Sequence, residues 1–137
     1  TLNKLVTHIV NELEDIAAFK NIEIRVRQQQ ELSLRLDSSL ASIVVSNLIR
    51  NALFHNMEGG EVNITITEDA LLIANTSAQS SLDAGQVFSR FYKSDTSAKG
   101  TGLGLAIVQA ICNLYGFLIS YHYDNSQHIF KLEFHPA

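Results

Sequence analysis

Glycine recurs at every second position directly before an apolar helical repeat in the segment "KGTGLGLAIVQAI", residues 99–111. Glycine is unfavourable in a helix by about 1 kcal/mol relative to alanine, so three of them at a helix entry need a compensating role. The first N–H groups of a helix have no partner within the helix and carry partial positive charge, which suits phosphate. The segment therefore predicts a phosphate-binding helix start; the alternative is a glycine-rich loop that only turns the chain.

The residues around these glycines exclude two common phosphate-binding motifs. A Walker P-loop needs Lys and then Ser or Thr after its last glycine, whereas Gly104 is followed by Leu105 and Ala106. The dinucleotide motif G-x-G-x-x-G needs glycine at position 105 and a strand just before Gly100, and the preceding "FYKSDTSA" has no strand pattern. Phosphate binding by these glycines would have to follow another arrangement.

Composition limits the classes of protein to which the chain can belong. Its 137 residues are 46% hydrophobic, which predicts a single domain over 1–137 with its own core. Ten Lys and Arg against 14 Asp and Glu give a net charge of −4, which argues against nucleic acid as a partner. No apolar stretch approaches the roughly 20 residues of a membrane span, so no direct membrane contact is expected. The single cysteine, Cys112, lies on an apolar repeat and is expected to pack in the core of a protein from a reducing compartment.

The hydrophobic pattern predicts three helices. Apolar residues recur at helical spacing over 2–19, and the polar residues 37–39 offer N-caps for a second helix that runs to about residue 56. A third helix is expected over 103–115, with Gly116 as its C-cap.

Alternating hydrophobicity predicts the strands of a sheet. Residues 76–102 carry little periodicity and are expected to form a long mobile loop. The sum is an α/β two-layer sandwich, in which a mixed, mostly antiparallel sheet of about five strands is covered on one face by three helices. The expected strands are 22–26, 32–36, 62–66, 71–75 and a hairpin over 117–134 that turns at 124–126.

The second predicted helix carries three polar residues in register. Asn47, Asn51 and His55 fall within about 80° of arc at 100° per residue, on the side of the helix that is otherwise expected to pack. Buried amides without partners cost roughly 1–3 kcal/mol each, so they are expected to bind a ligand or, alternatively, neighbouring backbone or buried water. An amide oxygen is a neutral, hard ligand that suits Mg²⁺ beside phosphates.

The motifs, taken in order, resemble those of sensor histidine kinases. The helix "SNLIRNALFHN" (46–56), the strand end "IAN" (73–75), the loop "FSRFYK" (88–93) and "GTGLGL" (100–105) are similar to that family's N-box, first glycine box, F-box and second glycine box. The family's catalytic and ATP-binding domain belongs to an ATPase group that includes gyrase, the Hsp90 chaperones and MutL. The resemblance covers nearly the whole chain.

The resemblance implies a role for each polar residue of the first two boxes. Asn51 matches the asparagine that holds magnesium, and Asn47 the one that helps to order metal and phosphates. His55 matches a position near the phosphates, and Asn75 the aspartate that hydrogen-bonds the adenine amino group. Two departures weaken the adenine site: Asn75 lacks the aspartate's charge, and Ser77 replaces the next glycine of the box.

The remaining predicted ATP-binding residues belong to the F-box, the mobile ATP lid and the second glycine box. The resemblance implies that the F-box packs the base of the lid and that glycine-box N–H groups meet the polyphosphate. Arg90, Lys93 and Lys99 around the lid are expected to substitute in part for a cation that the family often carries at the position of Phe54; the alternative is that they only form a solvated loop face. The remaining predicted ATP-binding residues are Phe88, Phe91, Tyr92, Lys93, Lys99, Gly100, Thr101, Gly102, Leu103, Gly104 and Leu105.

The family's phospho-acceptor is a histidine followed by an acidic residue, on a separate dimerisation helix. None of the five histidines here is followed by Asp or Glu, and His8 is expected to lie on the surface of the first helix. The resemblance therefore implies an ATP- and Mg²⁺-binding protein-histidine kinase domain without its acceptor, taken from the cytosolic part of a longer sensor of a kind that includes membrane-bound proteins. Its implied partners are the dimerisation domain and a response regulator. Two alternatives stay open: a regulatory docking module with a degenerate nucleotide site, and an anti-sigma-type serine kinase.

Overall fold

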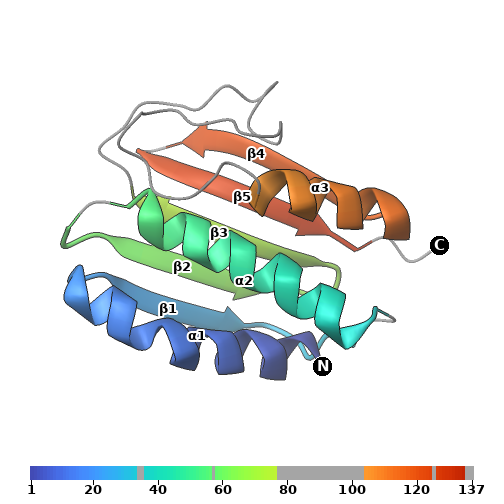
Figure 1. The fold of residues 1–137 in the computed structure, drawn as a ribbon, viewed down its shortest axis with the longest axis horizontal. Helices are drawn as coiled ribbons and strands as arrows, with labels where there is room; N and C mark the ends of the chain where they lie inside the picture. The colour runs from blue at the N-terminus through green and yellow to red at the C-terminus, as the bar shows by residue number, and fades with distance from the viewer. Residues whose placement is uncertain (34–35, 57, 77–103, 125, 135–137) are drawn as a thin grey trace.

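The computed structural model describes residues 1–33, 36–56, 58–76, 104–124 and 126–134, and in this part of the chain a five-stranded sheet carries three helices (Figure 1). The strand order is β1-β2-β3-β5-β4, in which β1 and β2 are parallel and the other neighbours antiparallel. The predicted two-layer α/β sandwich is confirmed. The elements in chain order are α1 (Leu2–Phe19), β1 (Glu23–Gln28), α2 (Ser38–Phe54), β2 (Glu61–Ile66), β3 (Ala70–Thr76), α3 (Gly104–Tyr115), β4 (Leu118–Asp124) and β5 (Gln127–Glu133).

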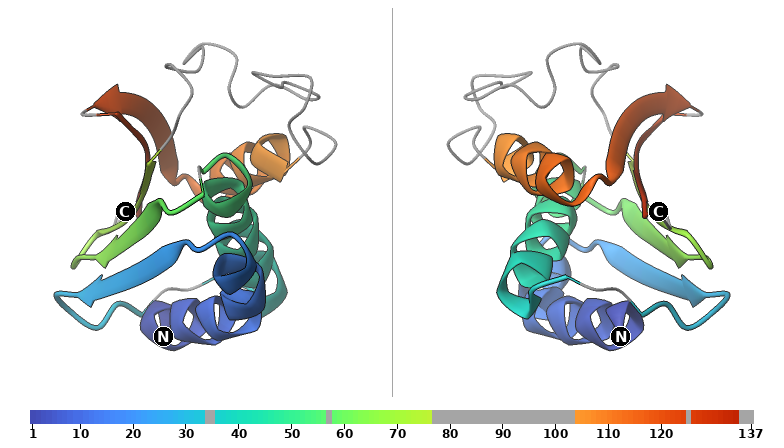
Figure 2. Two further views of the ribbon diagram at one scale, coloured as in Figure 1. Left: turned by 90° about the vertical axis from the view of Figure 1, so that its left-hand side faces the viewer. Right: turned by 90° about the vertical axis from the view of Figure 1, so that its right-hand side faces the viewer.

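All three helices of the described residues lie on one face of the sheet, as the side views show (Figure 2). Strand alternation follows from this: Val62, Ile64 and Ile66 of β2 face the helices and are fully buried, while the residues between them are half-buried. The hydrophobic core lies between the sheet and the helices. Burying an aliphatic side chain of this size there contributes about 1.5–3 kcal/mol to the stability of the fold.

The strand predicted over 32–36 is wrong for the residues of that stretch that the structure describes, which form no strand. Leu32 is buried in the core, but both of its backbone groups are used by the start of α1. Its N–H donates to Asn3 Oδ1 at 2.8 Å, and its carbonyl accepts from Leu2 N–H at 2.8 Å. Asn3 also donates to the carbonyl of Gln30 at 2.9 Å. These long-range contacts replace a sheet ladder.

Helix α2 has a clear start and a clear end. Asp37 caps it by accepting from the N–H groups of Ser39 and Leu40 at 2.9 and 3.1 Å, as the sequence predicts. The helix ends at Phe54, two residues before the predicted end, and His55 is the C-cap. Lys20 Nζ donates to the carbonyl of Leu53 at 2.8 Å, which places a positive charge at the negative end of the helix dipole.

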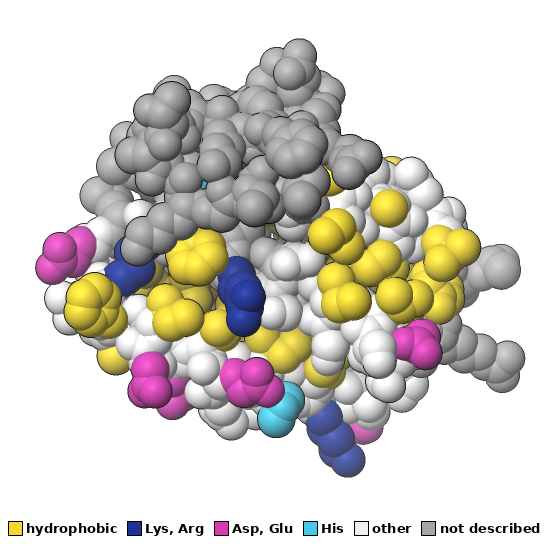
Figure 3. Space-filling view, viewed as in Figure 1, with side chains coloured by type: hydrophobic (Ala, Val, Ile, Leu, Met, Phe, Trp, Pro, Cys, Tyr) yellow, Lys and Arg dark blue, Asp and Glu magenta, His cyan; other side chains and the backbone are white. Residues whose placement is uncertain are grey.

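Helix α3 packs on the core by one side. Cys112 is fully buried there, as predicted, and burial raises the pKa of its thiol to about 11. Gly116, at φ +72°, follows the helix in the left-handed conformation expected of a C-cap glycine. The other side of α3 carries Ile107 and Leu114, which are 43% and 73% exposed. Figure 3 shows apolar side chains gathered over α3 on the helix-bearing face. No helix among the described residues has the length and apolar character needed to span a membrane.

Candidate functional site

The C-terminal half of α2 and its C-cap carry the three polar residues predicted to bind a ligand. Asn47, Asn51 and His55 are half-buried, at the edge of the side of α2 that packs on the core. Arg50, expected on the opposite side, is exposed. No hydrogen bond joins the Asn47 or Asn51 side chain to another described residue. The two amides are therefore available to a ligand within this part of the structure.

The start of α3 lies against one of these amides. A Cβ atom placed on Gly104, the first residue of α3, would be 3.5 Å from Asn47 Oδ1. Leu105, the next residue, packs against the core and holds the helix start in place. Because the first N–H groups of a helix have no partner within it, backbone donors and an amide side chain meet at this point. Two motifs that are far apart in the sequence are thus adjacent.

Asn75 carries an unsatisfied acceptor inside the protein. The residue lies near the end of β3, faces the helices and is 0% exposed. Its Nδ2 donates to the carbonyl of Thr76 at 3.0 Å, which fixes the orientation of the amide. Its Oδ1 is buried and has no hydrogen-bond partner among the described residues. Such an atom costs about 1–3 kcal/mol, so the position suits a ligand that brings a donor.

A hydrogen-bond network fixes the end of α2 against the sheet. Thr76 Oγ1 donates to Asn56 Oδ1 at 2.9 Å, and Asn56 Nδ2 donates to the carbonyl of Glu61 at 2.9 Å. The Glu61 N–H donates back to Thr76 Oγ1 at 2.8 Å. This closed set holds α2, β2 and β3 in one geometry and so positions Asn75 relative to α2. Sequence reasoning missed it, because its members are ordinary polar residues at or next to the ends of the predicted elements.

His128 is another buried polar residue near Asn75, and sequence reasoning did not predict it as a site residue. It lies on β5 directly opposite Asn75 of β3 and is 1% exposed. Its Nδ1 is 2.7 Å from the Tyr121 hydroxyl, and its Nε2 has no partner among the described residues. Burial, and to a lesser extent the charge of His55, lowers the pKa of this imidazole. The available signal was its place in the inward-facing alternation with Phe130 and Leu132.

The structure describes only some of the predicted site residues. It places Asn47, Asn51 and His55 on one side of α2, and Gly104 beside Asn47. His8 is exposed on α1 and pairs with Glu12 one turn later, as expected of a surface residue. The predicted lid lies outside the described residues, and so do Phe88, Phe91, Tyr92, Lys93, Lys99, Gly100, Thr101, Gly102 and Leu103.

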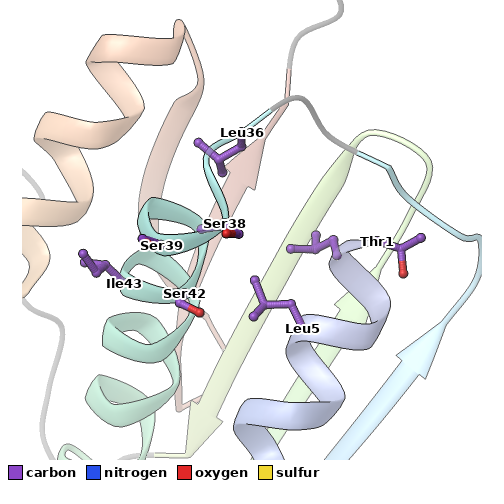
Figure 4. Close-up of a pocket in the computed structure, with 9 residues that line it drawn as sticks. Thr1, Leu5, Leu36, Ser38, Ser39, Ser42 and Ile43 are labelled. Atoms are coloured by element: carbon purple, nitrogen blue, oxygen red, sulfur yellow. The ribbon is translucent and has the colours of Figure 1, made fainter.

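A separate apolar groove lies at the other end of α2. Its volume is about 570 Å³, and it opens between the starts of α1 and α2, where Leu5, Leu36 and Ile43 line it (Figure 4). Asn51 and His55 lie at the C-terminal end of α2, so this groove is not part of the polar site.

The sequence of the chain matches one known family over most of its length. Residues 36–135 match the model of the family described as histidine kinase-, DNA gyrase B-, and HSP90-like ATPase. The chain belongs to this ATPase family. The predicted resemblance to this ATPase group is confirmed.

Curated relatives of this ATPase domain are sensor proteins. It is 32% identical over 138 residues to the sensor histidine kinase HprS of Escherichia coli K12, covering 96% of this chain and 30% of HprS. It is 32% identical over 136 residues to the heme sensor protein HssS of Staphylococcus epidermidis RP62A, again covering 96% of this chain and 30% of the relative. The chain thus spans about a third of these proteins.

Solved structures share the fold. The catalytic domain of histidine kinase ThkA has a TM-score of 0.84 at 24% identity, covering 96% of this chain and 90% of that domain. The cytoplasmic segment of histidine kinase QseC has a TM-score of 0.75 at 20% identity, covering 99% of this chain and 76% of that one. Histidine kinase ThkA has also been solved in complex with the response regulator protein TrrA. The matching chain of that structure has a TM-score of 0.76 at 22% identity, and the match covers 98% of this chain and 40% of the matching chain.

Proposed function

We propose that this ATPase domain is the catalytic domain of a sensor histidine kinase, transferring the γ-phosphoryl group of Mg²⁺-ATP to a histidine on a separate dimerisation domain. The observation that carries the proposal is the contact between Gly104 and Asn47, 3.5 Å from an added Cβ to Oδ1, because it joins the glycine-box helix to the asparagine helix. Backbone donors and amide oxygens at one place suit a polyphosphate with its metal ion.

The base end of the site fits adenine. Asn75 Oδ1 is a buried acceptor without a partner among the described residues, and the 6-amino group of adenine is a donor. The hydrogen bond from Nδ2 to Thr76 holds the oxygen, rather than the nitrogen, free for this role. An amide accepts more weakly than the carboxylate expected at this position, so we propose binding of moderate affinity.

The phosphate end of the site rests on α2. Asn51 would hold Mg²⁺ through its amide oxygen, and Asn47, one turn earlier, would orient the phosphates beside the first N–H groups of α3. Bound Mg²⁺ supplies charge that stabilises the transferring phosphoryl group. The residues of this chain position the phosphates and offer fixed donors to their charge, which is most of what phosphoryl transfer asks of a protein.

The acceptor histidine and the response regulator are proposed partners. The relatives HprS and HssS are named sensors and are much longer than this chain, which supports an acceptor on another domain of a longer protein. The ThkA complex with a response regulator supports the same kind of downstream partner here. The QseC cytoplasmic segment supports a cytoplasmic location. A histidine kinase named among the relatives favours histidine over serine as the acceptor.

One observation favours a second function. Asn75 is neutral where the family's aspartate is expected, so a domain that binds nucleotide poorly and serves as a regulatory docking surface is the competing candidate. Titration of the wild-type domain with ATP and Mg²⁺ separates the two. Undetectable binding at millimolar nucleotide would favour the docking module.

The residue-level test is Asn51→Ala, with Asn11→Ala as a matched control on the exposed surface of α1. We expect Asn51→Ala to abolish the Mg²⁺-dependent part of ATP binding in calorimetry, and with it phosphotransfer to the dimerisation domain encoded in the same gene. Asn11→Ala should behave as wild type. Retained Mg²⁺-dependent phosphotransfer in Asn51→Ala would contradict the role given to this residue.

A further inference from the structure

Asn75 and His128 form a pair of buried polar side chains on neighbouring strands. They are register partners between β3 and β5, and both lie on the sheet face that the helices cover. Their exposed fractions are 0% and 1%. Side chains of directly opposite residues have Cβ atoms roughly 4.5–5.5 Å apart, so one small planar group can contact both.

Each member of the pair has one satisfied atom and one free atom. Asn75 uses Nδ2 on the Thr76 carbonyl and leaves Oδ1 without a partner; His128 uses Nδ1 on the Tyr121 hydroxyl and leaves Nε2 without one, among the described residues. Buried polar atoms are rarely left unpaired in folded proteins. Two such atoms on neighbouring side chains indicate that a ligand binds here with two adjacent polar groups along one of its edges.

The surroundings of His128 set the direction of the free nitrogen. Tyr121 lies on β4, on the side of β5 away from β3, and the two ring nitrogens point to opposite sides of the imidazole. Nε2 is therefore directed away from Tyr121. The ring is held by aromatic neighbours, with centroids of Tyr121 and Tyr123 at 5.7 and 5.3 Å. It is a fixed part of the site wall.

The protonation of His128 follows from the same contacts. Burial and the nearby His55 lower the pKa of the ring, so it is neutral at pH 7 and has one N–H. A phenol is a stronger donor than a neutral imidazole N–H, so we assign the Tyr121 hydroxyl as donor to Nδ1. The ring hydrogen then lies on Nε2, which makes the free nitrogen a donor.

We propose that Asn75 and His128 together recognise adenine, with Asn75 Oδ1 accepting from the 6-amino group and His128 Nε2–H donating to the adjacent ring nitrogen N1. This inference rests on the proposed nucleotide site and assigns it a further residue. Guanine carries an oxygen at position 6 and an N–H at N1, so it presents an acceptor where Asn75 needs a donor and a donor where His128 needs an acceptor. His128 is thus a specificity-determining residue that selects adenine nucleotides over guanine nucleotides.

The test measures the affinity of three nucleotides by calorimetry: ATP, GTP and 1-deaza-ATP, in which N1 is replaced by C–H. We expect the wild-type domain to bind ATP about tenfold more tightly than 1-deaza-ATP, the effect of one buried hydrogen bond. In His128→Phe this preference should fall to about one. His122→Phe, at an exposed position on β4, is the matched control and should keep the wild-type preference.

A second readout does not depend on a substitution at a buried site. In the ¹⁵N NMR spectrum of histidine side chains, Nε2 of His128 should remain protonated and shift when ATP is added, but not when GTP is added at the same concentration. The His128 resonance is identified as the one that is missing from the spectrum of His128→Gln, a variant that lacks the imidazole but keeps a side-chain N–H donor. An Nε2 resonance that ATP leaves unchanged, or an ATP to 1-deaza-ATP ratio that His128→Phe leaves unchanged, would overturn the inference. A wild-type domain that binds none of the three nucleotides would instead overturn the proposed function.

Discussion

At the scale of single residues, the candidate site contains buried polar atoms without hydrogen-bond partners among the described residues, and these atoms destabilise the free protein. Asn75 Oδ1 is buried without a partner among the described residues, and an atom of this kind costs about 1–3 kcal/mol in the free protein. A ligand that brings a donor removes this cost and gains affinity by the same amount. Asn75 therefore lowers the stability of the free protein and raises its affinity for a ligand, and a substitution can separate these two effects.

Replacing Asn75 with leucine separates them. Leucine has a similar volume and removes the unsatisfied oxygen together with the bond from Nδ2 to Thr76, so the free energy of unfolding should stay within about 1 kcal/mol of wild type. The dissociation constant for ATP should rise at least about tenfold. Urea unfolding and calorimetry measure the two quantities. Asn63→Leu, half-buried on β2, is the control for the added apolar group. A strongly destabilised Asn75→Leu with unchanged ATP affinity would mean that the residue is structural.

At the scale of elements, the decisive contact is between α3 and α2. Gly104 does not need to be glycine for its own backbone, because its φ is not among the positive values and an added Cβ would be in ordinary contact with Asn47 at 3.5 Å. The reason for glycine there must come from what approaches the helix start. Gly116, at the other end of α3, does need to be glycine, since its φ is +72°.

The substitutions Gly104→Ala and Gly116→Ala should therefore have opposite effects. Gly104→Ala is expected to raise the free energy of unfolding by about 0.5–1 kcal/mol, through helix propensity, while weakening ATP binding. Gly116→Ala is expected to lower stability by about 1 kcal/mol or more and to leave the affinity of the folded protein for ATP unchanged. Thermal unfolding and nucleotide titration test both. Unchanged ATP affinity in Gly104→Ala would indicate that this glycine only turns the chain.

The elements also show what sequence alone can predict. Helix α1 was predicted over its observed residues, and the β4–β5 hairpin turns where predicted, because local periodicity and turn residues determine both. The strand predicted over 32–36 failed because long-range bonds to Asn3 and Leu2 decide the backbone of Leu32. The pairing of Asn75 with His128 could not be predicted, because β3 and β5 are separated in sequence by α3 and β4, and their adjacency is set by the strand order.

At the scale of the whole molecule, folding keeps one imidazole neutral inside the protein. His128 lies on the sheet face that carries the helices and is buried there, and its pKa is below the ordinary value of 6.5, first because of burial and second because of the charge of His55. The unfolded chain binds a proton there more readily than the folded chain does. Folding stability is therefore linked to pH through this residue.

The free energy of unfolding should fall as the pH drops below about 6.5, because the unfolded state then takes up a proton that the folded state resists. The contribution of His128 is fully present above its ordinary pKa and is lost toward acid, with a slope of at most about 1.4 kcal/mol per pH unit. Urea titrations at pH 7.5, 6.5 and 5.5 measure the slope in wild type and in His128→Gln, which has no titrating ring.

The two curves should run parallel above pH 6.5 and diverge below it, the wild type losing stability faster. Glu23 does not produce this divergence, because Arg25 lowers the pKa of its carboxyl below its ordinary value of 4.5, and both proteins contain the pair. Equal slopes below pH 6.5 would mean that the folded protein accommodates a charged His128. Such a ring would carry N–H groups on both nitrogens at acid pH, so Nδ1 would then donate to the Tyr121 hydroxyl instead of accepting from it.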